Sequence, residues 1–381
     1  MGTIKLNSSI KNDEYTNYVY EAFDIQNKEE TEVEVSFNLS EAKDFDWNIG
    51  VIYGSSGSGK TTILKRMGEL SKSVFDGDKP LISNFDWIEP KDATLLLTSM
   101  GLSSVPTWLR PFHLLSNGEQ YRAGLAYKVG KAKEGEVILI DEYTSVVDRD
   151  VAKAMSFALQ KYLRKTNKRI ILASCHFDIM EWLMPDWTCS PQKGGALERG
   201  EWLRQGRPQI KLQVSRVESN TWDFFKKHHY LTEKVNKSCQ FLLFEWNNKP
   251  VAMCCVLNTP RKGMGEAMAI SRIVVLPDFQ GMGIGYKLCS FVGGIYKNRG
   301  NRLFIKTVNP ALGIKFNNIN EWRGTTFNGK KSPHVNLDAK AKNRFDRISY
   351  CHEYDYENIS GYEELLKPIK EMREAKNLTL F

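Results

Sequence analysis

The sequence predicts an α/β fold in two domains, residues 1–205 and 206–381, and three observations support this prediction. A chain of 381 residues is long enough for two or three domains of ~150 residues each. Its composition, 41% apolar and 26% charged, is typical of globular proteins and excludes disordered and fibrous ones. Each half also contains an apolar strand, a glycine-rich loop and a helix in direct succession, near residues 48–67 and 270–297.

The domain boundary is predicted from a change in pattern. The polar, glycine-bearing stretch Ser190–Arg207 has the composition of a linker. A new alternation of apolar and polar residues begins at Ile210–Val214, which is typical of a strand.

Neither the apolar runs nor the cysteines point to a membrane or secreted protein. The run Val251–Leu257 is far shorter than the ~20 residues that a membrane-spanning helix needs. The seven cysteines form no CxxC pair and no cluster with zinc-ligand spacing, so we expect reduced thiols, mostly in the core. These observations predict a cytoplasmic protein with no membrane domain.

The charge is distributed unevenly along the chain. Residues 1–200 hold 24 basic and 28 acidic side chains, a net charge of −4, whereas residues 201–381 hold 29 and 17, a net charge of +12. A basic C-terminal half favours a polyanionic partner, either nucleic acid or an anionic cofactor such as coenzyme A. An evenly solvated basic surface explains the same count.

The first glycine-rich loop has the pattern of a P-loop. The apolar strand Asn48–Tyr53 leads directly into GSSGSGKTT, and a helix follows from Ile63. Glycines in such a loop let backbone N–H groups surround phosphate oxygens, a lysine reaches the β- and γ-phosphates, and a hydroxyl binds Mg²⁺. We expect Lys60 and Thr61 in these last two roles. The residues predicted to bind ATP here are Gly54, Ser55, Gly57, Ser58, Gly59, Lys60, Thr61 and Thr62.

Two further motifs follow the P-loop. Residues 115–120 read LSNGEQ, which matches the signature of ABC-type ATPases. The apolar strand Val137–Ile140 ends in two carboxylates, of which Asp141 is expected to bind Mg²⁺ and Glu142 to polarise the attacking water. A D-loop pattern comes next at Thr144–Asp148. His176 follows another apolar strand, at the place of the switch histidine of ABC ATPases.

The resemblance to ABC-type ATPases implies a mechanism. In that family two nucleotide-binding domains pair head to tail, and each ATP lies between one P-loop and the other subunit's signature. Ser116, Gly118 and Glu119 would therefore contact ATP across an ATP-dependent homodimer. Glu142 would act as the general base and His176 would contact the γ-phosphate.

The chain departs from the transporter members of this family. Only 56 residues separate Lys60 from Ser116, and no glutamine lies between Thr61 and Ser116 to supply a Q-loop. Tyr143 stands where transporters usually have proline. The aromatic residue expected to stack on adenine is left open among Tyr20, Phe23 and Phe37, each of which is equally suited to a core.

The second glycine-rich loop reads QGMGIG at residues 280–285, after a strand and Leu276-Pro277. A dinucleotide-binding fold would place an acid ~20 positions further on, but Ile305 stands there and no acid is near it. The order of elements instead resembles motif A of GNAT acyltransferases, in which a bulged strand and the next loop bind the pyrophosphate of acyl-CoA. The residues expected to bind acyl-CoA, in practice acetyl-CoA, are Val274, Val275, Gln280, Gly281, Met282, Gly283, Ile284 and Gly285.

The pattern leaves more than one candidate for the base of the acyl-transfer step. His229 and Tyr230 lie in a loop that suits either a proton acceptor or a purely structural cap, and Glu266 is a second candidate base. Trp322 and Arg323 suit either stacking and pairing with a nucleic acid, or a core and a surface position.

Together these motifs resemble a family of microbial and phage proteins in which an ABC-type ATPase is fused to a predicted GNAT acetyltransferase domain. The C-terminal half is also distantly similar to Mom-type proteins that modify adenine in DNA. The resemblance implies a P-loop ATPase domain followed by a GNAT-like α/β domain, with ATP, Mg²⁺ and acetyl-CoA as cofactors and nucleic acid as a candidate acceptor. The alternative is an ATP-dependent switch that binds nucleic acid or protein and retains a non-catalytic GNAT fold.

Overall fold

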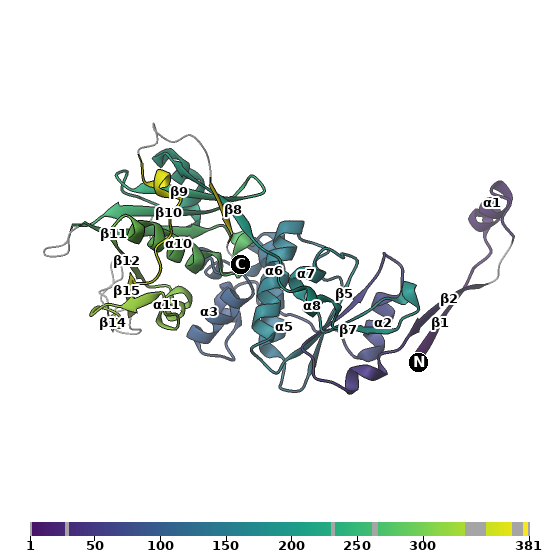
Figure 1. Ribbon diagram of the computed structural model, residues 1–381. Helices are drawn as coiled ribbons and strands as arrows, with labels where there is room; N and C mark the ends of the chain where they lie inside the picture. The colour runs from purple at the N-terminus through teal and green to yellow at the C-terminus, as the bar shows by residue number, and fades with distance from the viewer. Residues whose placement is uncertain are drawn as a thin grey trace. The chain divides into compact units, whose positions relative to one another are not determined.

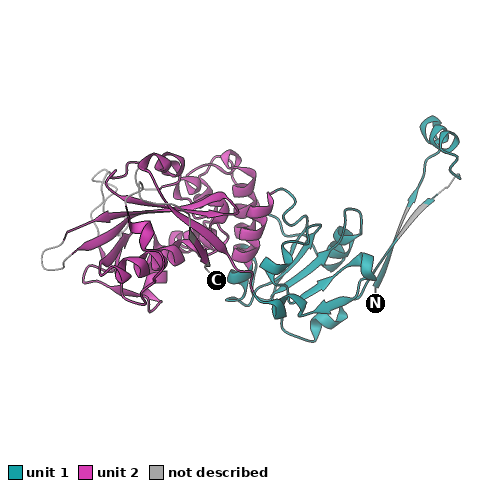
Figure 2. Ribbon diagram, turned by 45° about the horizontal axis from the view of Figure 1, so that its top comes forward, with its two compact units in different colours: residues 1–72, 131–146, 160–206 teal, residues 73–130, 147–159, 207–381 magenta. Residues whose placement is uncertain are grey.

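The computed structural model describes residues 2–26, 30–229, 233–260, 266–331, 348–367 and 376–379. The chain forms two compact units (Figure 2). Unit 1 comprises residues 1–72, 131–146 and 160–206, and unit 2 comprises residues 73–130, 147–159 and 207–381. The chain thus passes from unit 1 to unit 2 for the last time after residue 206. Two earlier segments, residues 73–130 and 147–159, belong to the same compact unit as the C-terminal half. The assignment of residues 1–205 to a single ATPase domain stays a prediction.

Unit 1 is built on a five-stranded sheet with the order β4-β5-β3-β6-β7. Neighbouring strands run parallel except for the last pair. The strand bounds are β3 Ile49–Tyr53, β4 Val137–Ile140, β5 Arg169–Ser174, β6 Trp187–Cys189 and β7 Leu197–Arg199. The three strands predicted around the P-loop, the paired carboxylates and His176 are confirmed. Their near-continuous apolar sequences are those of strands buried on both faces.

The remaining elements of unit 1 are short. A separate antiparallel pair joins β1 to β2, with α1 between them in sequence (Figure 1). The bounds are β1 Gly2–Ser9, α1 Glu14–Ala22, β2 Glu30–Phe37, α2 Lys60–Met67, α7 Met180–Leu183 and α8 Glu201–Gln205.

The stretch Ser190–Arg207 is not a linker, which corrects the expectation from its composition. It contains β7, which pairs antiparallel with β6, and the short helix α8. Its polar residues are compatible with this placement because β7 is an edge strand, and one side of an edge strand has no neighbouring strand to cover it.

The core of unit 1 requires a glycine beneath a tryptophan. A Cβ atom at Gly50 of β3 would lie 2.0 Å from Cζ2 of Trp187, which is fully buried in β6. Trp187 also meets Trp47 edge to face, with ring centroids 5.5 Å apart. The indole therefore occupies the volume that a side chain at position 50 would need.

Unit 2 is built on a larger sheet with the order β13-β15-β12-β11-β10-β9-β8-β16, and β14 pairs with β15. The strand bounds are β8 Lys211–Val217, β9 Gln240–Trp246, β10 Lys249–Asn258, β11 Ala267–Val275, β12 Arg302–Thr307, β13 Trp322–Gly324, β14 Lys330–Lys331, β15 Ile348–Tyr354 and β16 Lys376–Thr379. The predicted hairpin is confirmed as β9 and β10, which turn at Asn247 and Asn248 with φ values of 51° and 61°.

The middle of this sheet opens between two parallel strands. β11 pairs with β12 only from Ala267 opposite Arg302 to Ile270 opposite Ile305. Directly after that, the register of β11 against β10 shifts, so that Ser271 is an extra residue between the partners of Cys255 and Val256. The bulge that the resemblance to motif A predicts is therefore present in β11. The pairing of β11 with β12 ends at this point.

Helices of unit 2 come from three separate parts of the chain. Their bounds are α3 Pro90–Ser99, α4 Val105–Trp108, α5 Asn117–Lys131, α6 Arg149–Leu163, α9 Trp222–Phe225, α10 Ile284–Asn298 and α11 Pro310–Asn317. The helix predicted after the second glycine loop is confirmed as α10, which packs on β10, β11 and β12 (Figure 1). Helix α6 belongs to both units: its residues up to 159 belong to unit 2, and its residues from 160 onward belong to unit 1.

The described cysteines are mostly core residues, as predicted: Cys175 is exposed and the other six are buried. Across the described ranges, each helix falls short of the length or the apolar character needed to cross a bilayer.

The packing at Gly50 yields a first prediction. Replacing Gly50 by Ala should lower the free energy of unfolding by about 1–3 kcal/mol, because the new methyl group overlaps the Trp187 ring. Urea unfolding followed by tryptophan fluorescence measures this change. Gly77→Ala is the control, because a Cβ there meets only an ordinary contact at 3.9 Å, and its effect should stay within about 0.5 kcal/mol. Equal stabilities of the two variants would contradict the packing argument.

Candidate nucleotide and acyl-CoA sites

The P-loop joins β3 to α2 and turns through two left-handed glycines. Gly57 and Gly59 have φ values of 79° and 90°, which side chains other than glycine rarely adopt. Gly59 is the N-cap of α2, and a Cβ there would lie 2.6 Å from the Val35 side chain. The Lys60 ammonium donates to the carbonyl oxygens of Gly54 (2.9 Å) and Ser55 (2.7 Å). The loop therefore curls around its own lysine at the N-terminus of a helix, where an anion is favoured.

A glutamine outside the sequence motifs braces this loop. Gln192 accepts a hydrogen bond from the Ser55 backbone N–H at 3.0 Å through Oε1 and donates to the Ser55 hydroxyl at 2.8 Å through Nε2. No sequence rule places Gln192 here, because it lies 137 residues from Ser55 and follows a strand outside the known motifs. It holds the first serine of the P-loop in a fixed orientation.

The switch histidine follows β5, which pairs with β3, and the carboxylates follow β4, which pairs with the other side of β5. Asp141 and Glu142 end β4, and His176 follows β5, so all three lie at the sheet edge from which the P-loop emerges. Oδ1 of Asp141 accepts from the backbone N–H of Glu142 at 2.9 Å. Glu142 itself has a φ of 52°, a strained conformation that is typical of functional positions.

Hydrogen bonds fix the orientation of His176. Its Nδ1 lies 3.1 Å from the hydroxyl of buried Thr144, and its backbone N–H donates to the Ser174 hydroxyl at 3.1 Å. Ser174 in turn donates to the carbonyl oxygen of Tyr143, which is fully buried. Tyr143, which stands at the usual proline position, is thus part of the core. Thr144 is a hydrogen-bonding partner of His176 that the sequence motifs did not predict.

The donor groups near this edge suit Mg²⁺ better than a transition metal. Among the residues that the structure describes, no three His, Cys, Asp or Glu side chains form a metal-binding cluster. Mg²⁺ is usually held by one or two protein oxygens together with substrate phosphates, and Thr61 and Asp141 offer a hydroxyl and a carboxylate. Both residues therefore fit the predicted role.

The signature motif lies in unit 2, at the start of α5. Ser116 and Glu119 form a reciprocal capping box, in which Glu119 Oε2 accepts from the Ser116 N–H at 3.0 Å and the Glu119 N–H donates to the Ser116 hydroxyl at 3.3 Å. Oε1 of Glu119 accepts from the Thr107 hydroxyl at 2.8 Å. Burial raises the pKa of Glu119, but these hydrogen bonds outweigh it and the pKa lies below the ordinary value. Glu119 thus sets the shape of the motif and leaves Ser116 and Gly118 at its surface.

The second glycine loop joins β11 to α10 in the same manner as the P-loop. Gly281 and Gly283 have φ values of 86° and 85°, and Gly283 is the N-cap of α10. The Gln280 side chain is held inside the protein: Nε2 donates to the Val275 carbonyl at 2.9 Å, and Oε1 accepts from the Ser103 N–H at 2.8 Å. Gln280 therefore braces the loop from within.

The other predicted acyl-CoA contacts divide into two kinds. The side chains of Met282, Ile284 and Val274 are buried in the core, so only their backbone groups can reach a ligand. A Cβ at Gly285 would meet nothing closer than Val275 at 3.6 Å, so the first turn of α10 leaves space beside it. This first turn has N–H groups without intrahelical partners, which suit a phosphate.

Of the candidate groups for acyl transfer, Glu266 lies far from this loop. Glu266 precedes β11, and the nine residues of that strand put it about 30 Å from the glycine loop at ~3.3 Å per residue. It accepts a hydrogen bond from Asn301. His229 packs edge-on against Trp222, with ring centroids 5.9 Å apart, and Tyr230 lies outside the described residues. Arg272 donates to the carbonyl of Lys234, which ties the segment after His229 to β11 beside its bulge.

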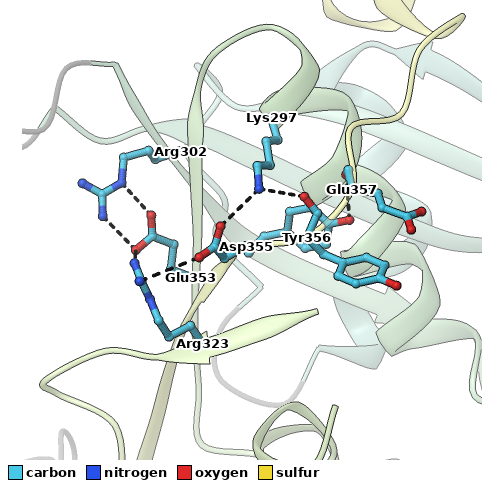
Figure 3. A network of polar contacts seen from close by, with 8 residues as sticks. Lys297, Arg302, Arg323, Glu353, Asp355, Tyr356 and Glu357 are labelled. Atoms are coloured by element: carbon cyan, nitrogen blue, oxygen red, sulfur yellow. Dashed lines mark hydrogen bonds and ion pairs between the residues drawn. The ribbon is translucent and has the colours of Figure 1, made fainter. Parts of the chain in front are cut away.

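Of the two alternatives left open for Trp322 and Arg323, the structure supports a core position for Trp322 and a surface position for Arg323. Trp322 is 5% exposed, and its indole N–H donates to Ser290 at 2.9 Å, so its ring cannot stack on a base. Arg323 pairs with Glu353 at 3.3 Å and with Asp355 at 3.7 Å. Figure 3 shows that Arg302 and Lys297 take part in the same network. These three cations share the two carboxylates of Glu353 and Asp355, so the five charged groups sum to +1.

Part of the chain matches a known protein family. Residues 178–313 match the model of the acetyltransferase (GNAT) family. The match spans β8 to β12 and the glycine loop, and it agrees with the C-terminal part of the predicted fusion. The α/β fold class is likewise as predicted. A search of curated proteins gives no match.

Solved structures similar to the chain include cassettes and acetyltransferases. The ATP-binding cassette MJ0796, in a dimeric post-hydrolysis state with ADP and Pi, is 16% identical with a TM-score of 0.33, over 46% of this chain and 92% of that one. The ribosomal-protein-S18-alanine N-acetyltransferase from Escherichia coli is 14% identical with a TM-score of 0.30, over 39% and 97%. Arabidopsis thaliana Naa50 with the bisubstrate analogue CoA-Ac-MVNAL is 14% identical with a TM-score of 0.30, over 38% and 99%.

The ion-pair network predicts a pH-dependent contribution to stability. Hydrogen bonds from Arg302 lower the pKa of Glu353 below its ordinary value of 4.5. A carboxyl group with a depressed folded-state pKa stabilises the fold above its unfolded-state pKa, and this stabilisation is lost as the pH falls through the folded-state value. Glu353→Gln should therefore cost about 1 kcal/mol at pH 7, a modest amount because solvent screens the arginines, and almost nothing once Glu353 is protonated in both states.

Urea unfolding at pH 7 and near pH 3 tests this sign. Glu357→Gln is the matched control, because only the backbone carbonyl of Glu357 accepts a bond in this network. An equal loss for Glu353→Gln at both pH values would show that the ionised pair does not supply the stabilisation.

Proposed function

We propose that this protein is an ABC-type ATPase joined to a GNAT-type N-acyltransferase that uses acetyl-CoA. The ATPase half rests on one observation. The P-loop, Asp141, Glu142 and His176 all follow the C-terminal ends of three adjacent parallel strands in the unit 1 sheet. Phosphate binding, Mg²⁺ binding, polarisation of water and contact with the γ-phosphate are the tasks that ATP hydrolysis requires.

The roles follow from the chemistry of each group. The P-loop N–H groups and Lys60 bind the β- and γ-phosphates, while Thr61 and Asp141 hold Mg²⁺, which neutralises the developing charge. Glu142 acts as general base toward water, and Thr144 keeps the His176 ring facing the phosphate. A second copy of the chain supplies Ser116 and Gly118, so hydrolysis requires a head-to-tail homodimer.

The transferase half is supported by the family match and by the opening between β11 and β12. The first turn of α10 and the glycine loop bind the pyrophosphate of acetyl-CoA. Beyond the bulge at Ser271, the parted strands leave unpaired edges to which the amide-containing arm of the cofactor can bond. The thioester would lie near the point where the strands diverge. There an amine of the acceptor would attack the thioester carbonyl carbon, the C–S bond would break, and CoA would leave as the thiol while the amine loses a proton.

A second function is favoured by one observation. Glu266 directly precedes β11, five residues before the bulge at Ser271 where the thioester is proposed to react, as a switch with a non-catalytic GNAT fold would allow. Acetyl transfer to a nucleic acid or to a protein supports the first function. Nucleotide-dependent association with DNA or RNA without acetyl-CoA binding supports the second.

The ATPase assignment predicts opposite behaviour for two variants. Lys60→Ala should raise the Kd for ATP roughly 10–100-fold, because a charged contact to phosphate is lost. Glu142→Gln should keep ATP affinity but lower hydrolysis by about 10²–10⁴-fold and accumulate an ATP-bound dimer. Phosphate release and analytical ultracentrifugation measure these effects, with Glu134→Gln in an exposed turn as control. Unimpaired hydrolysis by Glu142→Gln would contradict the general-base role.

The pyrophosphate site predicts sensitivity to charge at the start of α10. Gly285→Glu should weaken acetyl-CoA binding at least about tenfold by placing a carboxylate beside the phosphates, while the helix itself tolerates an acid in its first turn. Gly285→Gln separates charge from bulk and should weaken binding less. Calorimetric titration measures both Kd values, and unchanged affinity in Gly285→Glu would place the cofactor elsewhere.

A further inference from the structure

Within unit 2, the segment that carries the ATPase signature holds the acyl-CoA loop directly. The backbone N–H of Ser103 donates to Oε1 of Gln280 at 2.8 Å, and Nη1 of Arg122 in α5 donates to the carbonyl oxygen of Pro277 at 3.0 Å. A Cβ at Gly101 would lie 2.9 Å from the Gln280 carbonyl oxygen. Residues 101–122 therefore touch the beginning of the loop at three points.

Arg122 links this contact to the signature itself. Its side chain is 2% exposed, and Nη2 lies 3.8 Å from Oδ1 of Asp278. A Cβ at Gly118, one turn earlier in α5, would lie 3.9 Å from the same Nη2. Burial lowers the pKa of Arg122, while the charges of Asp278, Glu119 and Asp148 raise it. The guanidinium is thus enclosed between the signature motif and the acyl-CoA loop.

The D-loop reaches the same glycine loop through α6. Asp148 of the D-loop accepts hydrogen bonds from the N–H groups of Asp150 (2.9 Å) and Val151 (3.1 Å) at the start of this helix. Two turns further along, the Ala158 methyl group would lie 2.7 Å from a Cβ at Gly281, and the Cα of Gly101 would lie 2.9 Å from it. Gly281 therefore packs against both α6 and the segment at Gly101, and a movement of either one displaces it.

The geometry points to Arg122 and Gln280 as positioning residues that couple the nucleotide state of the ATPase to the affinity of the acyl-CoA loop. This inference rests on the proposed function, in which ATP of a partner copy binds to Ser116 and Gly118. That contact moves the start of α5, which its capping box holds together as a unit, and Arg122 transmits the new position to Pro277. Gln280 connects the same movement to Val275 at the end of β11, where the cofactor arm begins. Closely packed contacts of this kind shift as a unit.

Thermodynamic linkage makes the coupling measurable from both sides. Bound nucleotide should tighten acetyl-CoA binding, and acetyl-CoA should tighten nucleotide binding by the same factor. Couplings of this type are typically about 5–150-fold. In the full-length protein we expect a factor of about tenfold within that range.

The test is a calorimetric titration of acetyl-CoA into the full chain, with and without a non-hydrolysable ATP analogue and Mg²⁺. Arg122→Met should bind both ligands but show the same acetyl-CoA Kd in the two conditions. The matched control is Arg216→Met, because Arg216 also donates to a backbone carbonyl of unit 2, that of Leu365, and bonds to Gln240 rather than to residues 101–122. It should retain the full effect of nucleotide.

The outcomes separate this inference from the proposed function. Binding of neither ligand by the parent protein would overturn the proposed function. Binding of both ligands without mutual effect would overturn the coupling and leave the proposed function intact. A nucleotide effect that persists in Arg122→Met would overturn the route through Arg122.

A measurement on the unaltered protein guards against a variant that does not fold. Hydrogen exchange of the peptide covering residues 276–283 should slow when the ATP analogue is added without acetyl-CoA. Protection of the P-loop alone, with unchanged exchange in residues 276–283, would contradict the coupling.

Discussion

A strand that passes directly into a helix must turn its backbone within a few residues, and this constraint shapes both halves of the protein. β3 enters α2 through Gly59 with a φ of 90°, and β11 enters α10 through Gly283 with a φ of 85°. Each glycine is the N-cap of its helix, so the first N–H groups of the helix stay available at the mouth of the loop. Two unrelated sequences thus share one backbone geometry, in which the N-terminus of the helix is left open and its dipole favours an anion.

The polar side chains nearest these loops mainly hold the loops in place. Gln192 fixes Ser55, Gln280 spans Val275 and Ser103, and Glu119 closes the signature capping box. Side chains that are committed in this way contribute little direct ligand contact. They reduce the number of conformations of the backbone that does bind, which lowers the entropy lost on binding.

Charge is organised more locally than the sequence totals suggest. Glu353 pairs with both Arg302 and Arg323, and Asp355 pairs with Lys297 (Figure 3). Arg122, in contrast, is enclosed and compensated by a carboxylate at 3.8 Å and by a carbonyl oxygen. A buried charge of this kind tolerates few alternative arrangements, because each must supply equivalent partners. That property makes it suited to hold two segments in one relative position.

The sequence by itself determined the strands that flank the two glycine loops, the loops themselves and the residue types at the strand ends, because apolar runs, glycine and an adjacent lysine or carboxylate are local signals. Only the tertiary structure decided which side chains brace the loops, that Trp322 is buried, that Ser190–Arg207 contains a strand, and that Glu266 lies at the far end of β11. It also decided that residues 73–130 are compact with the C-terminal half. The physical reason is that these facts depend on contacts between residues far apart in the chain. Gln192 and Ser55 are 137 residues apart, and Arg122 and Pro277 are 155 apart, so no local pattern encodes either contact.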